Sequence, residues 1–172
     1  MTATLVTKKT LTREQLRALL THPAGWIAMG FGSGLSPIAP GTTGSLVALI
    51  PWWFVLRELP IVWYIAVLIA AFVIGVWACD IAGKRLGVDD HRALVWDEFV
   101  GQWIALCAAP VGWPWMIAGF ALFRLFDIWT PWPIRVADRQ VRGGLGVMLD
   151  DVLAGIYALI VMQAAAAIIR HV

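Results

Sequence analysis

Charged side chains are scarce in this sequence. Asp, Glu, Lys and Arg make up 14% of the 172 residues, while 60% of the residues are hydrophobic; a soluble domain carries about 25% charged residues. This composition excludes an ordinary soluble domain and predicts a membrane protein with one domain over residues 1–172. The formal net charge of +2 is small and the charges are scattered, which argues against nucleic-acid binding.

Cysteine is almost absent as well. Cys79 and Cys107 are the two cysteines, and each lies in an apolar segment without a CxxC motif or a histidine nearby. Neither a disulfide nor a cysteine metal site is therefore expected. No cleavable signal peptide is expected either, because the first apolar run begins only near Gly25, after a polar and basic segment.

Long apolar runs predict an all-α protein, a polytopic membrane helical bundle with about five membrane-embedded helices. The expected helices cover residues of about 44–56, 60–82, 93–109, 113–129 and 152–169. Many of the eleven Trp residues flank these runs, as side chains that anchor helices at a membrane interface do. An N-terminal surface segment, residues 1–24, contains a Thr12–Gln15 capping box that predicts a short amphipathic helix.

The region from Ala93 to Trp129 is broken by Pro110, Gly112 and Pro114. It predicts two helices of about 25 Å each, shorter than a bilayer core of about 30 Å. One kinked span and a hairpin are both possible. The hairpin is favoured because, with the N-terminus inside, it leaves only Arg57 and Arg170 of the basic residues outside.

A loop from Gly30 to Ser45 holds five glycines and two prolines in sixteen residues. Irregular backbone at membrane level is tolerated only where it is buried in protein or lines a polar cavity. Hydroxyl groups of this loop, together with the N-terminus of the next helix, would form a cradle for an anion. Tight helix packing is the alternative explanation for so many glycines.

Five carboxylates fall near helix ends that this topology places on one side of the membrane. They are Asp97, Glu98, Asp127, Asp150 and Asp151. Mg²⁺ prefers carboxylates, water and phosphate oxygens as ligands, so the five predict a Mg²⁺ site. The Gly30–Ser45 loop, Arg124 and Arg135 would then receive a phosphate group.

Each of these groups also has a simpler interpretation. Asp150-Asp151 would be favourable charge at a helix N-terminus, and Arg124 with Asp127 would be an i, i+3 ion pair. Side chains 97 and 98 point about 100° apart on a helix, so only one of them is expected to face the centre of a cavity. His91, in a polar stretch, would be a solvated surface histidine.

Four stretches of the sequence resemble the phosphatidylglycerophosphatase A family of bacterial membrane phosphatases. They are GSGLSPIAPGTTGS (32–45), DHRALVWDEFVG (90–101), FRLFDIWTPWPIR (123–135) and DDVLAG (150–155). Their order and spacing fit, and the resemblance extends from about Trp26 to the C-terminus. Thr130 is a departure, because the family is expected to carry lysine before the Pro-Trp-Pro sequence.

The resemblance implies Mg²⁺-dependent hydrolysis of phosphatidylglycerophosphate to phosphatidylglycerol and phosphate, in the bacterial inner membrane. It implies a multi-pass protein with its active site facing the cytoplasm, acting on a phospholipid among membrane lipids without an obligate protein partner. The expected metal ligands are Glu98, Asp127, Asp150 and Asp151. The expected phosphate-binding residues are Ser33, Gly34, Ser36, Thr42, Arg124 and Arg135. The expected catalytic residues are Asp97, Glu98, Asp127 and His91.

Within that set, Glu98, Asp127 and Asp151 are expected to hold the metal, with Asp97 and Asp150 as further or indirect ligands. A metal-bound water is the preferred nucleophile, and attack by Asp97 to form an aspartyl-phosphate is the alternative. His91 would protonate the leaving alkoxide. A small proton- or ion-coupled membrane transporter subunit is the competing function, since intramembrane acids also mark ion pathways.

Overall fold

The computed structural model describes residues 11–88, 90–132 and 141–171, and in these residues it contains helices and no strand. The helices are α1 (Arg13–Leu20), α2 (Pro23–Ala28), α3 (Pro40–Phe54), α4 (Ile61–Leu86), α5 (Trp96–Ala105), α6 (Trp113–Trp129) and α8 (Gly143–His171). Two 3₁₀ segments, η1 (Gly30–Leu35) and η2 (Leu56–Glu58), connect them. The all-α prediction is confirmed.

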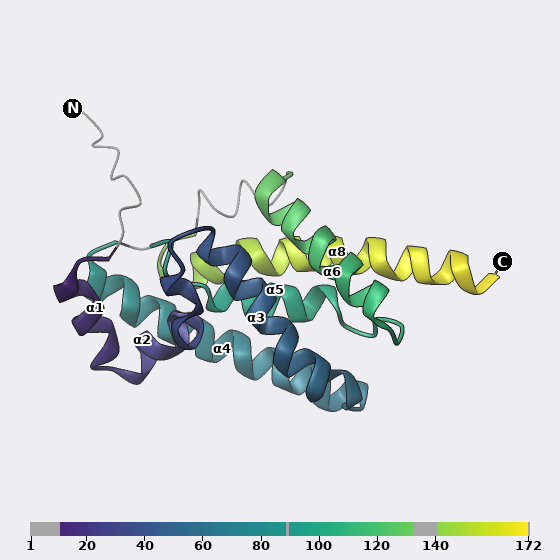
Figure 1. The fold of residues 1–172 in the computed structure, drawn as a ribbon, viewed down its shortest axis with the longest axis horizontal. Helices are drawn as coiled ribbons and strands as arrows, with labels where there is room; N and C mark the ends of the chain where they lie inside the picture. The colour runs from purple at the N-terminus through teal and green to yellow at the C-terminus, as the bar shows by residue number, and fades with distance from the viewer. Residues whose placement is uncertain (1–10, 89, 133–140, 172) are drawn as a thin grey trace.

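Helix α5 lies at the centre of the bundle, packed against α3, α4, α6 and α8 (Figure 1). Its aromatic side chains explain this position. Trp96 stacks on Phe99, and both rings meet Trp103 edge-on. The indole N–H groups of Trp96 and Trp103 donate to the carbonyl oxygens of Ala71 in α4 and Ala48 in α3, each at 2.9 Å. The short α5 is therefore fixed between two longer helices.

Helices α3, α5 and α8 begin at one end of the bundle, and α4 and α6 end there (Figure 1). The turn between α5 and α6 returns the chain to that end, because Arg124 of α6 pairs with Glu98 in the first turn of α5. The predicted hairpin is thus confirmed. The predicted N-terminal helix is confirmed too: Thr12 and Gln15 form a capping box at the start of α1.

Two predicted helix starts are wrong, for one physical reason. Helix α3 begins at Pro40 instead of about Gly44, and α8 begins at Gly143 instead of Val152. The glycines that indicate a loop in the sequence instead allow close packing between helices. A Cβ atom at Gly144 would lie 2.1 Å from the backbone oxygen of Val76 in α4. Smaller differences are that α5 begins at Trp96 and that α4 continues to Leu86.

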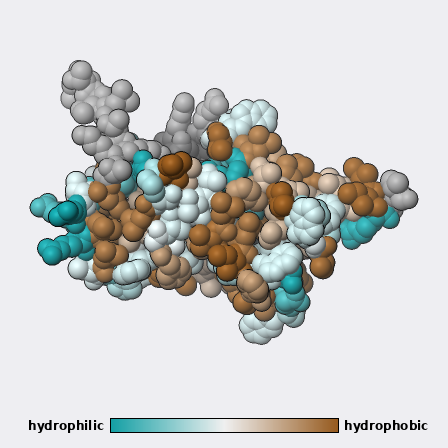
Figure 2. Space-filling model, viewed as in Figure 1, coloured by the Kyte–Doolittle hydropathy of each residue, from teal (hydrophilic) through white to brown (hydrophobic). Residues whose placement is uncertain are grey.

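Two of the described helices, Ile61–Leu86 and Gly143–Arg170, are long and apolar enough to cross a membrane. Only 22% and 28% of their most apolar windows are buried, whereas a core helix of a soluble protein would be mostly buried. Exposed apolar side chains cover much of the surface, and hydrophilic ones gather mainly toward the ends of the long axis (Figure 2). Such a surface is typical of a protein in contact with lipid. Helices α3, α5 and α6 have 15, 10 and 17 residues, so five embedded helices remain a prediction.

Candidate active site

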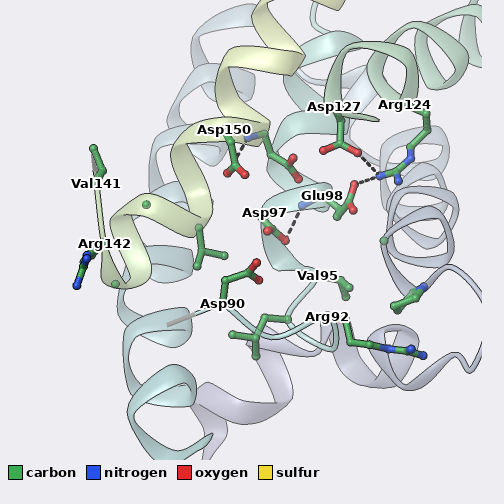
Figure 3. A pocket seen from close by; sticks show the side chains of 17 residues that line it. Asp90, Arg92, Val95, Asp97, Glu98, Arg124, Asp127, Val141, Arg142 and Asp150 are labelled. Atoms are coloured by element: carbon green, nitrogen blue, oxygen red, sulfur yellow. Dashed lines mark hydrogen bonds and ion pairs between the residues drawn. The ribbon is translucent and has the colours of Figure 1, made fainter. Parts of the chain in front are cut away.

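A cavity of about 370 Å³ opens at the end of the bundle where α3, α5 and α8 begin (Figure 3). Its walls come from the first turns of α3 and α5, the last turns of α6, the first turns of α8 and the segment before α5. Nine charged residues of the described part of the chain line it: Asp90, Arg92, Asp97, Glu98, Arg124, Asp127, Arg142, Asp150 and Asp151. All five carboxylates that were predicted from the sequence to form a Mg²⁺ site are among them.

Arg124 connects two of these carboxylates. Its Nη1 forms ion pairs with Glu98 Oε2 and, at 2.9 Å, with Asp127 Oδ2. The Ser45 hydroxyl of α3 donates to the same Glu98 oxygen at 2.9 Å. The Glu98 and Arg124 side chains are only 11% and 14% exposed. Helices α3, α5 and α6 are therefore joined by a buried polar network, and the ion pair of Arg124 with Asp127 is one part of it.

Glu98, Asp127 and Asp151 have the geometry of a metal site. One oxygen atom from each lies within 4.8 Å of the others. Asp151 is buried, and its Oδ2 has no hydrogen-bond donor among the described residues. Among the described residues, the three carboxylates have one arginine paired with them, Arg124, which leaves an excess of negative charge that a divalent cation would balance. A donor set of carboxylate oxygens suits Mg²⁺ and other hard cations.

Asp97 and Asp150 also line the cavity, outside this group of three. Asp97 Oδ1 accepts the backbone N–H of Glu98 at 3.0 Å, and Asp150 Oδ1 accepts that of Asp151 at 3.1 Å. Asp97 and Glu98 both line the cavity (Figure 3). Of the two, Glu98 belongs to the group of three carboxylates, and the expectation that only one of them faces the centre of the cavity stays a prediction. The helix-cap interpretation of Asp150 and Asp151 is wrong, since both lie two turns inside α8.

The predicted phosphate loop contributes differently from expectation. Among its residues, Pro40 and Gly41 line the cavity, whereas Ser33, Gly34, Ser36 and Thr42 are not among the lining residues. The hydroxyls of Ser33 and Ser36 donate to carbonyl oxygens within their own segment, at 2.9 and 2.8 Å. Gly34 packs against the backbone of Ala93, and Thr42 lies in the first turn of α3. Arg135 lies outside the described residues.

His91 is buried, so its interpretation as a solvated surface histidine is wrong. Its Nδ1 accepts the backbone N–H of Ala93 at 3.1 Å, and it is not among the residues that line the cavity. Two arginines at the cavity were missed from the sequence, Arg92 and Arg142. Their charged ends point away from the central carboxylates (Figure 3). Arg92 falls inside the 90–101 stretch, which is the signal that would have indicated it.

Comparison with known proteins gives one family model and two relatives that carry the same name. The family model described as Phosphatidylglycerophosphatase A matches residues 26–166. Phosphatidylglycerophosphatase A of Escherichia coli K12 is 50% identical over 141 residues, 81% of each chain. The Haemophilus influenzae protein of the same name is 46% identical over 146 residues, 84% of this chain and 90% of its own.

A Bacteroides thetaiotaomicron protein that is provisionally named a phosphatidylinositol-3-phosphatase is also 46% identical over 146 residues. That alignment covers 81% of this chain and 91% of the relative. No solved structure matches this chain.

Proposed function

This chain belongs to the phosphatidylglycerophosphatase A family and is a phosphoric monoester hydrolase, and we propose that it hydrolyses phosphatidylglycerophosphate to phosphatidylglycerol and phosphate in a Mg²⁺-dependent reaction. The observation that carries the proposal is the meeting of Glu98, Asp127 and Asp151 beside Arg124 in one cavity. Three carboxylates and one guanidinium suit a site that binds a metal and a phosphate together.

Glu98, Asp127 and Asp151 would hold the metal, with Asp150 close to them in the same wall of the cavity. When bound there, Mg²⁺ supplies a Lewis acid for the phosphoryl oxygens and orients the reacting groups. Ser45 and Arg124 fix the Glu98 carboxylate through their contacts with its Oε2. Preorganised ligands of this kind need no rearrangement when the substrate arrives.

Arg124 would also bind the phosphate. Its Nη1 forms ion pairs with two carboxylates, but its buried Nε has no hydrogen-bond acceptor among the described residues. A phosphate oxygen is a suitable acceptor for that N–H. Gly41, in the first turn of α3, lines the same cavity, and the first backbone N–H groups of a helix have no partner within the helix. They would add a second contact for an anion.

Water is the nucleophile in this proposal. Its oxygen bonds to phosphorus while the bond from phosphorus to the glycerol oxygen breaks, and Asp97 takes the proton that the water loses. Asp97 suits this role because it lines the cavity without belonging to the metal-binding group. Solvent in the open cavity supplies the proton for the leaving alkoxide. Attack by Asp97 itself is the alternative: its carboxylate oxygen would bond to phosphorus as the glycerol oxygen leaves, and reduction with borohydride would trap the aspartyl-phosphate before water hydrolyses it.

The predicted role of His91 as the acid is tested separately. His91→Gln should slow turnover more than it lowers thermal stability if the imidazole donates the proton. A variant that loses only thermal stability would assign His91 to the fold, in agreement with its contact to Ala93.

The proposed location is the bacterial inner membrane, with the cavity on the cytoplasmic side. In the described residues, Arg13, Arg17, Lys84, Arg85 and Arg92 belong to elements at the cavity end, whereas Arg57 and Arg170 lie toward the opposite end (Figure 1). Cytoplasmic ends of membrane helices carry such an excess of basic residues. A lipid substrate would keep its acyl chains in the bilayer while its phosphate entered the cavity.

The decisive experiment is phosphate release from phosphatidylglycerophosphate in mixed detergent micelles, with Mg²⁺ and with excess EDTA. Phosphatidic acid, lysophosphatidic acid and phosphatidylinositol-3-phosphate serve as competing substrates for selectivity. Glu98→Gln should abolish release without changing membrane insertion. Glu58→Gln is the matched control, because Glu58 is exposed, at the opposite end of the bundle, and paired with Arg57. If folded protein releases no phosphate, the transporter becomes the better hypothesis, and ion flux in liposomes would test it.

A further inference from the structure

A second hollow lies on the side of α6, next to the acid cavity. The described residues that line it are Ala121, Arg124, Leu125, Ile128 and Trp129. Four of these five side chains are apolar, and Arg124 also lines the acid cavity. The two hollows therefore share one side chain, and we refer to the second as the α6 groove.

The apolar residues of the α6 groove form a continuous stripe. Ala121, Leu125 and Ile128 are spaced i, i+4 and i+7, so they lie on one face of the helix. Leu125, Ile128 and Trp129 are 53%, 71% and 64% exposed, so the described part of the chain leaves them largely uncovered. Trp129 at the helix end is the kind of side chain that lies at the level of lipid headgroups. In a membrane, with Trp129 at the headgroup level, the groove would lie at the level of the glycerol backbone and upper acyl chains of the lipids.

Arg124 connects the two hollows chemically. Its guanidinium binds Glu98 and Asp127 in the acid cavity, while the side chain also lines the groove. Long basic side chains commonly lie along apolar surface with their stems and keep the charged end in a polar site. A ligand that occupies both hollows must therefore be apolar in one part and carry an anionic group within reach of the other.

We propose that the α6 groove binds the glycerol backbone and first methylene groups of the phospholipid substrate, so that its phosphate enters the acid cavity sideways from the bilayer. The inference rests on the proposed function and adds to it the binding site for the apolar part of the substrate. Leu125, Ile128 and Trp129 are then substrate-binding residues, and Arg124 lies where the apolar and ionic parts of the ligand meet.

The test compares Leu125→Gln with Ile117→Gln. Both residues are on α6, and their exposed fractions of 53% and 52% are nearly equal, but Ile117 is not in the groove. Initial rates are measured with a long-chain phosphatidylglycerophosphate and with its deacylated form, glycerophosphoglycerophosphate, both in detergent above its critical concentration. For Leu125→Gln, kcat/KM should fall about tenfold more for the lipid than for the deacylated substrate, which has no methylene groups to place in the groove, since even one methylene in an apolar site gives such discrimination. Ile117→Gln should leave that ratio unchanged, and equal effects of the two variants would overturn the proposal.

A second measurement does not depend on turnover. Unmodified protein in liposomes is photolabelled by a phospholipid that carries a diazirine near its glycerol end, either with a terminal phosphomonoester or without one. The proposal is supported if residues 121–129 are labelled by the probe with the phosphomonoester and not by the probe without it. Labelling of the peptide around Ile117 serves as the internal reference. Equal labelling by both lipids would overturn it, as would protection of the groove by a second copy of the chain. If labelling is positive while phosphate release fails, the catalytic proposal fails and the lipid site stands.

Discussion

Replacing Gly41 with alanine should displace the Glu98 carboxylate and stop catalysis while the protein stays folded. A Cβ atom at position 41 would lie 2.0 Å from Glu98 Oε1, 3.0 Å from its Cδ and 3.4 Å from Arg124 Nη1. Carbon–oxygen contacts are closest at about 3.3 Å, so the carboxylate would have to move by about 1.3 Å. Glu98 cannot keep its contacts with Ser45 and Arg124 after a shift of that size.

The expected effect on rate is large, and the protein should stay folded. A displacement of about 1 Å in a catalytic site can lower the rate about 100-fold. Alanine suits a helix better than glycine by about 0.5–1 kcal/mol, and Gly41 lies in the first turn of α3. This gain offsets only part of the loss of the buried contacts of Glu98, so the melting temperature in detergent should fall by several degrees, while phosphate release falls about 100-fold.

A second substitution tests the cause. Glu98→Asp shortens the side chain by one carbon–carbon bond, about 1.5 Å, which makes room for the alanine. Glu98→Asp alone should be slow, and the Gly41→Ala/Glu98→Asp double variant should be no slower than that, because the two positions are in contact and their effects are not additive. Full activity of Gly41→Ala, or additive losses in the double variant, would refute the argument that Gly41 exists to make space for Glu98.

Three further outcomes follow from the same geometry. Excess EDTA should abolish phosphate release and Mg²⁺ should restore it, and Asp151→Asn should raise the Mg²⁺ concentration needed for half-maximal rate at least about tenfold; an unchanged Mg²⁺ titration would contradict the ligand assignment. Arg124→Met leaves the buried carboxylate of Glu98 and the half-buried one of Asp127 without their shared cation, so the free energy of unfolding should fall by about 3 kcal/mol in EDTA, and Mg²⁺ should recover part of that loss in thermal unfolding in detergent. Tyr64→Phe removes a 2.6 Å hydrogen bond to a carbonyl oxygen of α5; it should cost about 1 kcal/mol of stability with phosphate release retained, and a loss of activity greater than the loss of folded protein would show that this distant contact reaches the site.

The loop prediction shows where sequence patterns become ambiguous. Glycine-rich segments at 41–44 and 143–146 indicate loops by composition, yet in the structure they lie in α3 and α8. A glycine is needed wherever a Cβ atom has no room, in a tight turn or between two helices in close contact. Gly44, for example, lies where a Cβ atom would be 2.9 Å from a side-chain carbon of Val95. Only the neighbouring helix distinguishes the two cases, and the neighbour is far away in sequence.

The sequence predicted the type of site, a cluster of acids beside an arginine, more completely than it predicted every residue of the site. The convergence of five carboxylates with Arg124 follows from charge bias and a hairpin, both of which can be inferred from sequence, and the cavity contains all six residues. The choice of cavity-lining residues in the 30–45 segment depends on where α3 begins. Because it begins at Pro40, Gly41 reaches the cavity, whereas the hydroxyls of Ser33 and Ser36 bond to nearby backbone.

The sequence by itself determined that this protein is all-helical and predicted a lipid-facing surface, because few folds that are stable in water combine scarce charge with long apolar runs. It also indicated the candidate functional residues, because charged side chains next to membrane segments cost free energy. The tertiary structure alone decided that Glu98, Asp127 and Asp151 lie within 4.8 Å of one another and that Arg124 lines both the acid cavity and the α6 groove. Distances of that kind depend on how closely α5, α6 and α8 approach, and that is set by contacts between residues separated by more than twenty positions.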